Sequence, residues 1–110
     1  MDRRIEIVVA EIEAQISWPW TTAELALLVN LSESRFRHFF KQETGYTPAQ
    51  FLRARRIEKV EVLLLTTFLT IKEISSLVGL KGGSQLVREF KKAYGMTPTT
   101  YRQAQQSNKR

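Results

Sequence analysis

The chain has no cysteine and only one histidine, His38, among its 110 residues. Without thiols it can form no disulfide and no thiolate metal site, and a single histidine is a poor basis for metal binding. No apolar run is as long as a bilayer span, and Glu6, Glu11 and Glu13 interrupt the segment where a secretory signal would lie. We therefore expect a cytoplasmic protein without metal or cofactor and without a membrane partner.

The sequence also offers little for catalysis. It has no glycine-rich phosphate loop, and no Ser–His–Asp set has a supporting spacing. Its acidic residues are scattered over predicted helix surfaces. We expect that the protein is not an enzyme.

The clearest positive feature is a repeat fifty residues apart. Residues 34–48 are echoed by residues 84–98, with Ser, Phe, Lys, Gly, Thr and Pro in register. The net charge of +6 follows the repeats: residues 1–30 carry two Lys or Arg against five Asp or Glu (−3), whereas residues 31–110 carry fifteen against six (+9). A basic repeat indicates a polyanionic partner, with DNA ahead of RNA or an anionic membrane.

Apolar periodicity and capping motifs predict an all-α protein. Pro48 and Pro98 occupy first helical positions, and Gly45 and Gly95 fall where a left-handed residue ends a helix. Capping boxes precede three helices, at Thr21/Glu24, Thr47/Gln50 and Thr70/Glu73. The seven predicted helices are 3–16, 22–29, 33–43, 48–65, 71–78, 83–93 and 98–106.

The second and third of these helices have the proportions of a helix-turn-helix. Ala26 is small where the pair must approach closely, and in the second copy Ser75 takes that place, with Gly79 at the turn. An ordinary αα-hairpin fits either copy alone, but two copies with basic second helices favour DNA reading. Two units are too few for a stable solenoid. The predicted organisation is an N-terminal helix-turn-helix subdomain, a linker helix and a C-terminal helix-turn-helix subdomain, over residues 1–46, 47–66 and 67–110.

Over about residues 5–106 the chain resembles the AraC/XylS family of bacterial transcription regulators. Leu80 departs from the family pattern, which usually has an aromatic residue after the turn glycine, and Gly82-Gly83 replaces polar residues that usually open the second recognition helix. Base contacts by the second copy therefore stay open. The resemblance is carried by Glu24-Leu25-Ala26, the runs 39–45 and 53–58, Leu63-Leu64, the run 71–74 leading to Val78-Gly79-Leu80, and above all the run 90–102.

The resemblance implies a reader of double-stranded DNA. Two helix-turn-helix subdomains, joined by a long helix, would place recognition helices 33–43 and 83–93 in successive major grooves. RNA polymerase is a further candidate partner. Such regulators usually carry a separate effector or dimerisation domain, which is absent from this chain, so either a stand-alone reader or a fragment of a longer regulator fits. A helical interaction module that docks an acidic protein partner is the alternative.

Site residues follow by similarity. Arginine can bind guanine through two hydrogen bonds, glutamine adenine, and valine a thymine methyl group. Arg37 and Arg88 are the leading base contacts, and a phosphate contact is the alternative for each arginine. We expect a structural role for Arg55. The expected base contacts are Ser34, Arg35, Arg37, His38, Ser84, Gln85, Val87 and Arg88. The expected backbone contacts are Thr21, Lys41, Thr47, Thr70, Lys91, Lys92 and Thr97, with solvation as the alternative for each lysine.

Overall fold

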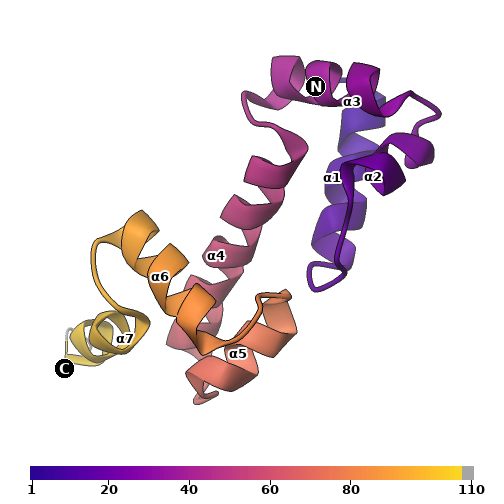
Figure 1. Cartoon of the computed structure of the whole chain (residues 1–110). Helices are drawn as coiled ribbons and strands as arrows, with labels where there is room; N and C mark the ends of the chain where they lie inside the picture. Colours follow the sequence, from indigo (N-terminus) through magenta and orange to yellow (C-terminus); the bar gives the residue numbers. More distant parts are fainter. Residues whose placement is uncertain (108–110) are drawn as a thin grey trace. The chain divides into compact units, whose positions relative to one another are not determined.

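The computed structural model describes residues 1–107 and is all-helical over that range (Figure 1). The last three residues of the predicted C-terminal subdomain lie outside the described residues. The helices are α1 (Arg3–Ala14), α2 (Thr22–Leu28), α3 (Glu33–Thr44), α4 (Pro48–Thr66), α5 (Ile71–Val78), α6 (Gly83–Tyr94) and α7 (Pro98–Ser107). The all-α prediction is confirmed, and six of the seven predicted helices end within one residue of these bounds.

The predicted end of the first helix is wrong. It was expected at Ile16, but α1 ends at Ala14, and Gln15 leaves the helical conformation with φ −132° and ψ 60°. Trp18 then donates its N–H to the Gln15 carbonyl at 3.1 Å, which closes a turn. Ile16 still packs against the core from this turn, and this is why the apolar stripe continued past the helix.

The helix starts follow from their capping residues. Thr21 and Thr70 each accept a hydrogen bond from the backbone N–H three residues on, and Glu24 and Glu73 return the bond to the backbone of the capping threonine. Gln50 completes the same reciprocal pair with the threonine before α4. These three predicted capping boxes are confirmed.

Two compact units divide the chain, Met1–Arg55 and Arg56–Arg110, and α4 contributes residues to both. Each unit has its own hydrophobic core. The core of the first is Ile5, Val8, Ile12, Leu25, Ala26, Phe36, Phe40, Phe51 and Leu52. The core of the second is Ile57, Val60, Leu64, Ile74, Val78, Leu80, Leu86 and Phe90.

The same turn joins the two helices of each pair. Leu31 donates its N–H to the Ala26 carbonyl at 3.1 Å, and Leu80 donates to the Ser75 carbonyl at 3.0 Å. The residue before each leucine is left-handed, with φ 55° at Asn30 and 82° at Gly79. Ala26 and Ser75 are almost fully buried, because a larger side chain at either position would push the paired helices apart. The chain therefore builds one structural motif twice.

Helix α7 is fastened to the second unit by polar contacts. The Tyr101 hydroxyl donates a hydrogen bond to the Glu61 carboxylate. Arg102 donates through Nε to the Leu64 carbonyl at 3.0 Å and through Nη2 to the Thr67 carbonyl at 3.3 Å. These bonds satisfy backbone acceptors at the C-terminal end of α4 that the helix itself leaves open.

Candidate nucleic-acid interface

Helix α3 carries a polar stripe on the side opposite its aromatic core residues. Phe36 and Phe40 are fully buried and Phe39 is half-buried. At about 100° per residue, the opposite side of the helix carries Ser34, His38 and Lys41, and all three are exposed. This stripe projects into solvent from a helix whose position is fixed by the first core.

The two arginines of α3 lie on opposite flanks of that stripe. Arg35 and Arg37 are about 160° apart around the helix axis, and both are exposed. Arg37 donates through Nη2 to Glu33 Oε1 at 3.2 Å, one turn earlier. Both partners of this pair are about half exposed, so solvent screens it and a DNA group can compete for Arg37.

Helix α6 repeats the arrangement with the same fifty-residue offset. Leu86 and Phe90 are fully buried, and the opposite side carries Ser84, Arg88 and Lys91, which are all exposed. Arg88 stands where the first copy has His38, and within the described residues it makes no hydrogen bond or ion pair. The flanking positions hold Gln85, Val87 and Lys92; the first two are half-buried and Lys92 is exposed.

The second copy differs at the start of its recognition helix. Ser32 caps α3 by accepting the Arg35 N–H at 3.2 Å, whereas Gly82 precedes α6 and provides no side-chain cap. Gln85 instead accepts the backbone N–H of Lys81 at 2.7 Å. A base contact by Gln85 through the same oxygen would compete with this bond. The structure therefore gives Gln85 a local role that sequence reasoning missed.

The predicted phosphate contacts at helix starts fall into two groups. At Thr21 and Thr70 the backbone N–H is occupied by a glutamate of the capping box. Hydrogen bonds to Trp18 and Thr21 lower the pKa of Glu24, and bonds to Thr70 lower the pKa of Glu73, so both carboxylates stay charged at neutral pH. A phosphate approaching either helix start would meet a negative charge.

The other two helix starts carry no such charge. The partner of Thr47 is Gln50, and the partner of Thr97 is Thr100, which donates its N–H at 3.2 Å. Their positive dipole ends suit an anion better than those of the first group. The three lysines expected at the backbone, Lys41, Lys91 and Lys92, are exposed near the ends of α3 and α6.

Arg55 has structural contacts, as expected. Its Nε lies 3.3 Å from Glu13 Oε1, and its guanidinium carbon lies 4.9 Å from the centre of the Phe51 ring. Arg56 is half-buried, and burial lowers its pKa. Within residues 1–107 no cluster of histidine and acidic side chains is suited to a metal ion.

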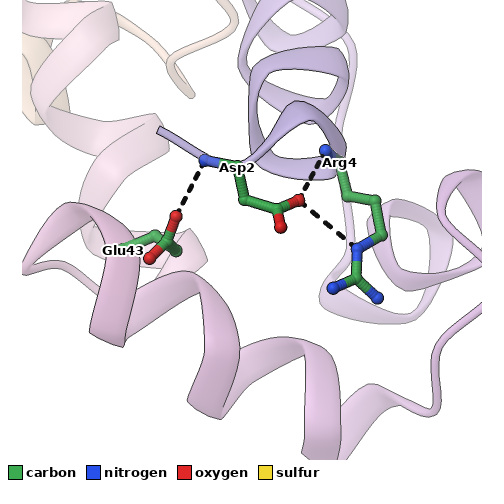
Figure 2. A network of polar contacts seen from close by, with 3 residues as sticks. All are labelled: Asp2, Arg4 and Glu43. Carbon is green, nitrogen blue, oxygen red and sulfur yellow. Dashed lines mark hydrogen bonds and ion pairs between the residues drawn. The ribbon is translucent and has the colours of Figure 1, made fainter.

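Sequence reasoning missed a polar network at the N-terminus (Figure 2). The Asp2 carboxylate accepts the Arg4 backbone N–H at 2.8 Å and contacts Arg4 Nε at 3.4 Å, while the Asp2 N–H donates to Glu43 Oε1 at 2.9 Å. The Arg4 guanidinium carbon lies 4.7 Å from the centre of the Phe39 ring. These contacts hold Arg4 beside α3, and no pattern in the sequence pairs residues so far apart.

In the described part of the chain none of the helices combines the length and apolar character that crossing a bilayer requires. Comparison with known proteins gives a match to the helix-turn-helix domain family over residues 25–104. The xylose operon regulatory protein of Escherichia coli K12 is 39% identical over 74 residues, which are 67% of this chain and 19% of that protein. The chain spans 19% to 36% of the length of such curated relatives.

Solved structures share the fold. The C-terminal domain of the two-component response regulator yesN from Fusobacterium nucleatum has a TM-score of 0.85 at 31% identity, over 92% of this chain and 99% of that chain. The DNA-binding domain of AdpA, a global transcriptional factor solved in complex with a target DNA, has a TM-score of 0.92 at 24% identity, over 97% and 96% of the two chains.

Proposed function

The chain belongs to the AraC/XylS family of helix-turn-helix transcription regulators, and on this premise we propose that it binds a specific sequence in double-stranded DNA. The observation that carries the proposal is the pair of equivalent exposed stripes. Helices α3 and α6 each present a basic, polar side on a helix held by an apolar core. A surface for an acidic protein would not require the same stripe twice at one offset.

The dimensions of the stripe suit a major groove. An α-helix with its side chains is about 10–12 Å across, and the groove of B-DNA is about 12 Å wide. A helix that enters the groove turns its outward side to the base edges and its flanks toward the groove walls. In α3 this places Ser34 and His38 over bases, with Arg35 and Arg37 at the two sides, where a long side chain can reach either a base or a phosphate.

We assign Arg37 and Arg88 as the leading base contacts. Arg37 must release the screened pair with Glu33, which costs only about 0.3–0.5 kcal/mol. Arg88 has no pair to release among the described residues and stands at the centre of the stripe of α6. Either guanidinium can form two parallel hydrogen bonds to guanine O6 and N7.

The second part of the proposal is that both recognition helices enter successive major grooves of one duplex. Adjacent major grooves repeat every ~34 Å, and a helix the length of α4, 19 residues, extends ~28 Å. A helical connector of that length supports the use of two grooves by one chain. The chain need not dimerise to contact two blocks of sequence.

Selection from a pool of random duplexes tests the function. We expect enrichment of a motif with two short blocks about one helical turn apart, bound far more tightly than random DNA and with affinity that falls steeply with salt. Enrichment of one block would limit base reading to one helix. Recovery of no motif, together with salt-insensitive binding, would refute DNA reading and favour the protein-interaction alternative.

The remaining assignments extend from the family. As a regulator the protein would work in the bacterial cytoplasm and contact RNA polymerase, and an effector or dimerisation domain would lie in further sequence. The short span relative to the curated relatives supports the last point. A supershift of the duplex complex by RNA polymerase tests the contact.

A further inference from the structure

A pocket of about 240 Å³ lies between the start of α1 and one flank of α3. Two arginines, one histidine and one glutamine line it, together with two apolar side chains, and no carboxylate is among its lining residues in the described structure. The lining residues are Arg4, Leu31, Arg35, His38, Phe39 and Gln42. Of these, Arg4 and Gln42 are outside the set of expected DNA contacts.

We propose that this pocket binds a phosphate of the DNA backbone that flanks the base pairs read by α3, with Arg4 as its principal ligand. The inference rests on the proposed DNA binding and adds a site to it. It also assigns Arg35 to the backbone, because Arg35 lines the same pocket.

Groove geometry selects a phosphate over a base. Because a helix nearly fills the major groove, a side chain from a different helix beside the flank of α3 meets the groove wall, and the wall is the sugar-phosphate backbone. Arg4 comes from α1, and Arg35 and Gln42 lie on the flank of α3 that faces it. The pocket therefore lies where a strand of the duplex must pass.

Arg4 is held in a binding posture before DNA arrives. Its guanidinium lies over the Phe39 ring, and its Nε edge faces the Asp2 carboxylate. Its two terminal amino groups make no bond to another described residue, and the side chain is 49% exposed. A guanidinium fixed in this way loses little side-chain freedom on binding, and its terminal groups match phosphate oxygens.

The nearby carboxylates do not cancel this role. Asp2 Oδ1 is bound to the Arg4 backbone N–H, and Glu43 Oε1 is bound to the Asp2 N–H. Neither lines the pocket. Their bonds fix the chain start against α3, so that they position Arg4 (Figure 2).

The test compares Arg4→Ala with Arg3→Ala on the enriched duplex. Both substitutions remove one positive charge from exposed neighbouring positions, but only Arg4 lines the pocket. Affinity is measured by fluorescence anisotropy over a series of salt concentrations. We expect Arg4→Ala to reduce the slope of log K against log salt by about 0.9, the value for one lost phosphate contact, and to weaken enriched and random duplexes by the same factor. Arg3→Ala should leave the slope nearly unchanged.

Two further arms keep the result decisive. Arg4→Lys should retain the slope, because it retains the charge. A scan of the duplex with single uncharged methylphosphonates should show one sensitive phosphate beside the first block for the wild-type protein, and that sensitivity should vanish in Arg4→Ala. The wild-type scan does not depend on whether Arg4→Ala folds, which circular dichroism checks separately.

Three outcomes overturn the inference. Equal slope changes for Arg4→Ala and Arg3→Ala would reduce the effect to net charge. Altered base selectivity with an unchanged slope would make Arg4 a base contact. A wild-type scan without a sensitive flanking phosphate would leave the pocket without a ligand. In each case the wild type still prefers its duplex, whereas failure of the proposed function would appear earlier, as the absence of any preferred duplex.

Discussion

Replacement of Arg37 by alanine tests how α3 reads DNA. The side chain is exposed, so its loss leaves no cavity in the first core, and the only bond removed within the described protein is the one to Glu33. That pair is worth about 0.3–0.5 kcal/mol, which is too little to change the fold. Any large effect on binding therefore arises from the DNA contact itself.

The expected loss on the enriched duplex is about 1–3 kcal/mol. At about 1.4 kcal/mol per tenfold change this is roughly 5-fold to 140-fold in Kd. Binding to random duplexes should change much less, because a base contact is made only with the correct base pair. Selectivity at one position of the first block should relax, while the other positions keep theirs.

Fluorescence anisotropy with the enriched duplex, its single-base variants and random DNA measures these differences. Lys41→Ala is the matched control, since it removes one positive charge from the same exposed helix. Glu33→Gln is a second control: it frees Arg37 and removes a negative charge, so it should strengthen binding to every duplex. An equal loss on enriched and random DNA for Arg37→Ala would refute base reading and make Arg37 a phosphate contact.

Three other predictions follow from the second unit. Lys91→Ala should weaken all duplexes alike and reduce the salt slope by about one; an unchanged slope in a salt titration would contradict this. The hydrogen bond to Glu61 and burial raise the pKa of Tyr101 to about 12. Its contribution to stability is then complete below about pH 10 and lost as pH rises toward 12. Tyr101→Phe should lower the free energy of unfolding by ~1 kcal/mol at neutral pH and flatten its fall in that window; equal alkaline slopes in urea unfolding would count against the bond. Gly83→Ala should raise the free energy of unfolding by about 0.4–1 kcal/mol, because its Cβ would lie an ordinary 3.6 Å from Ile71. Gly82→Ala, at φ +93°, should lower it by ~1 kcal/mol; the opposite order in urea unfolding would be wrong for this turn.

Much of the fold could be predicted because its signals are local. The capping boxes begin helices at fixed offsets, and Gly45 and Gly95 end them in the left-handed conformation, so nearly every helix bound follows from neighbouring residues. The exception was the end of α1, where Ile16 keeps its core contact from a turn. An apolar stripe indicates which side chains are buried, but it cannot tell a last helical turn from a packed loop.

The candidate site was predictable only in part. The exposed stripes of α3 and α6 follow from helical periodicity. The pocket at Arg4 does not, because it depends on contacts between Asp2 and Glu43 and between Arg4 and Phe39, far apart in the chain. The bond from Lys81 to Gln85 was also missed, since it compensates for a cap that Gly82 does not provide.

The central claim is that one chain reads two neighbouring grooves on one side of a duplex. Insertion of five base pairs between the two enriched blocks rotates one block by about half a helical turn without changing either sequence. We predict that the affinity for this duplex falls to that of a duplex with a single block. Insertion of a full turn should fail in the same way, because a connector of fixed length cannot follow it. An unchanged Kd for the half-turn duplex would contradict the claim.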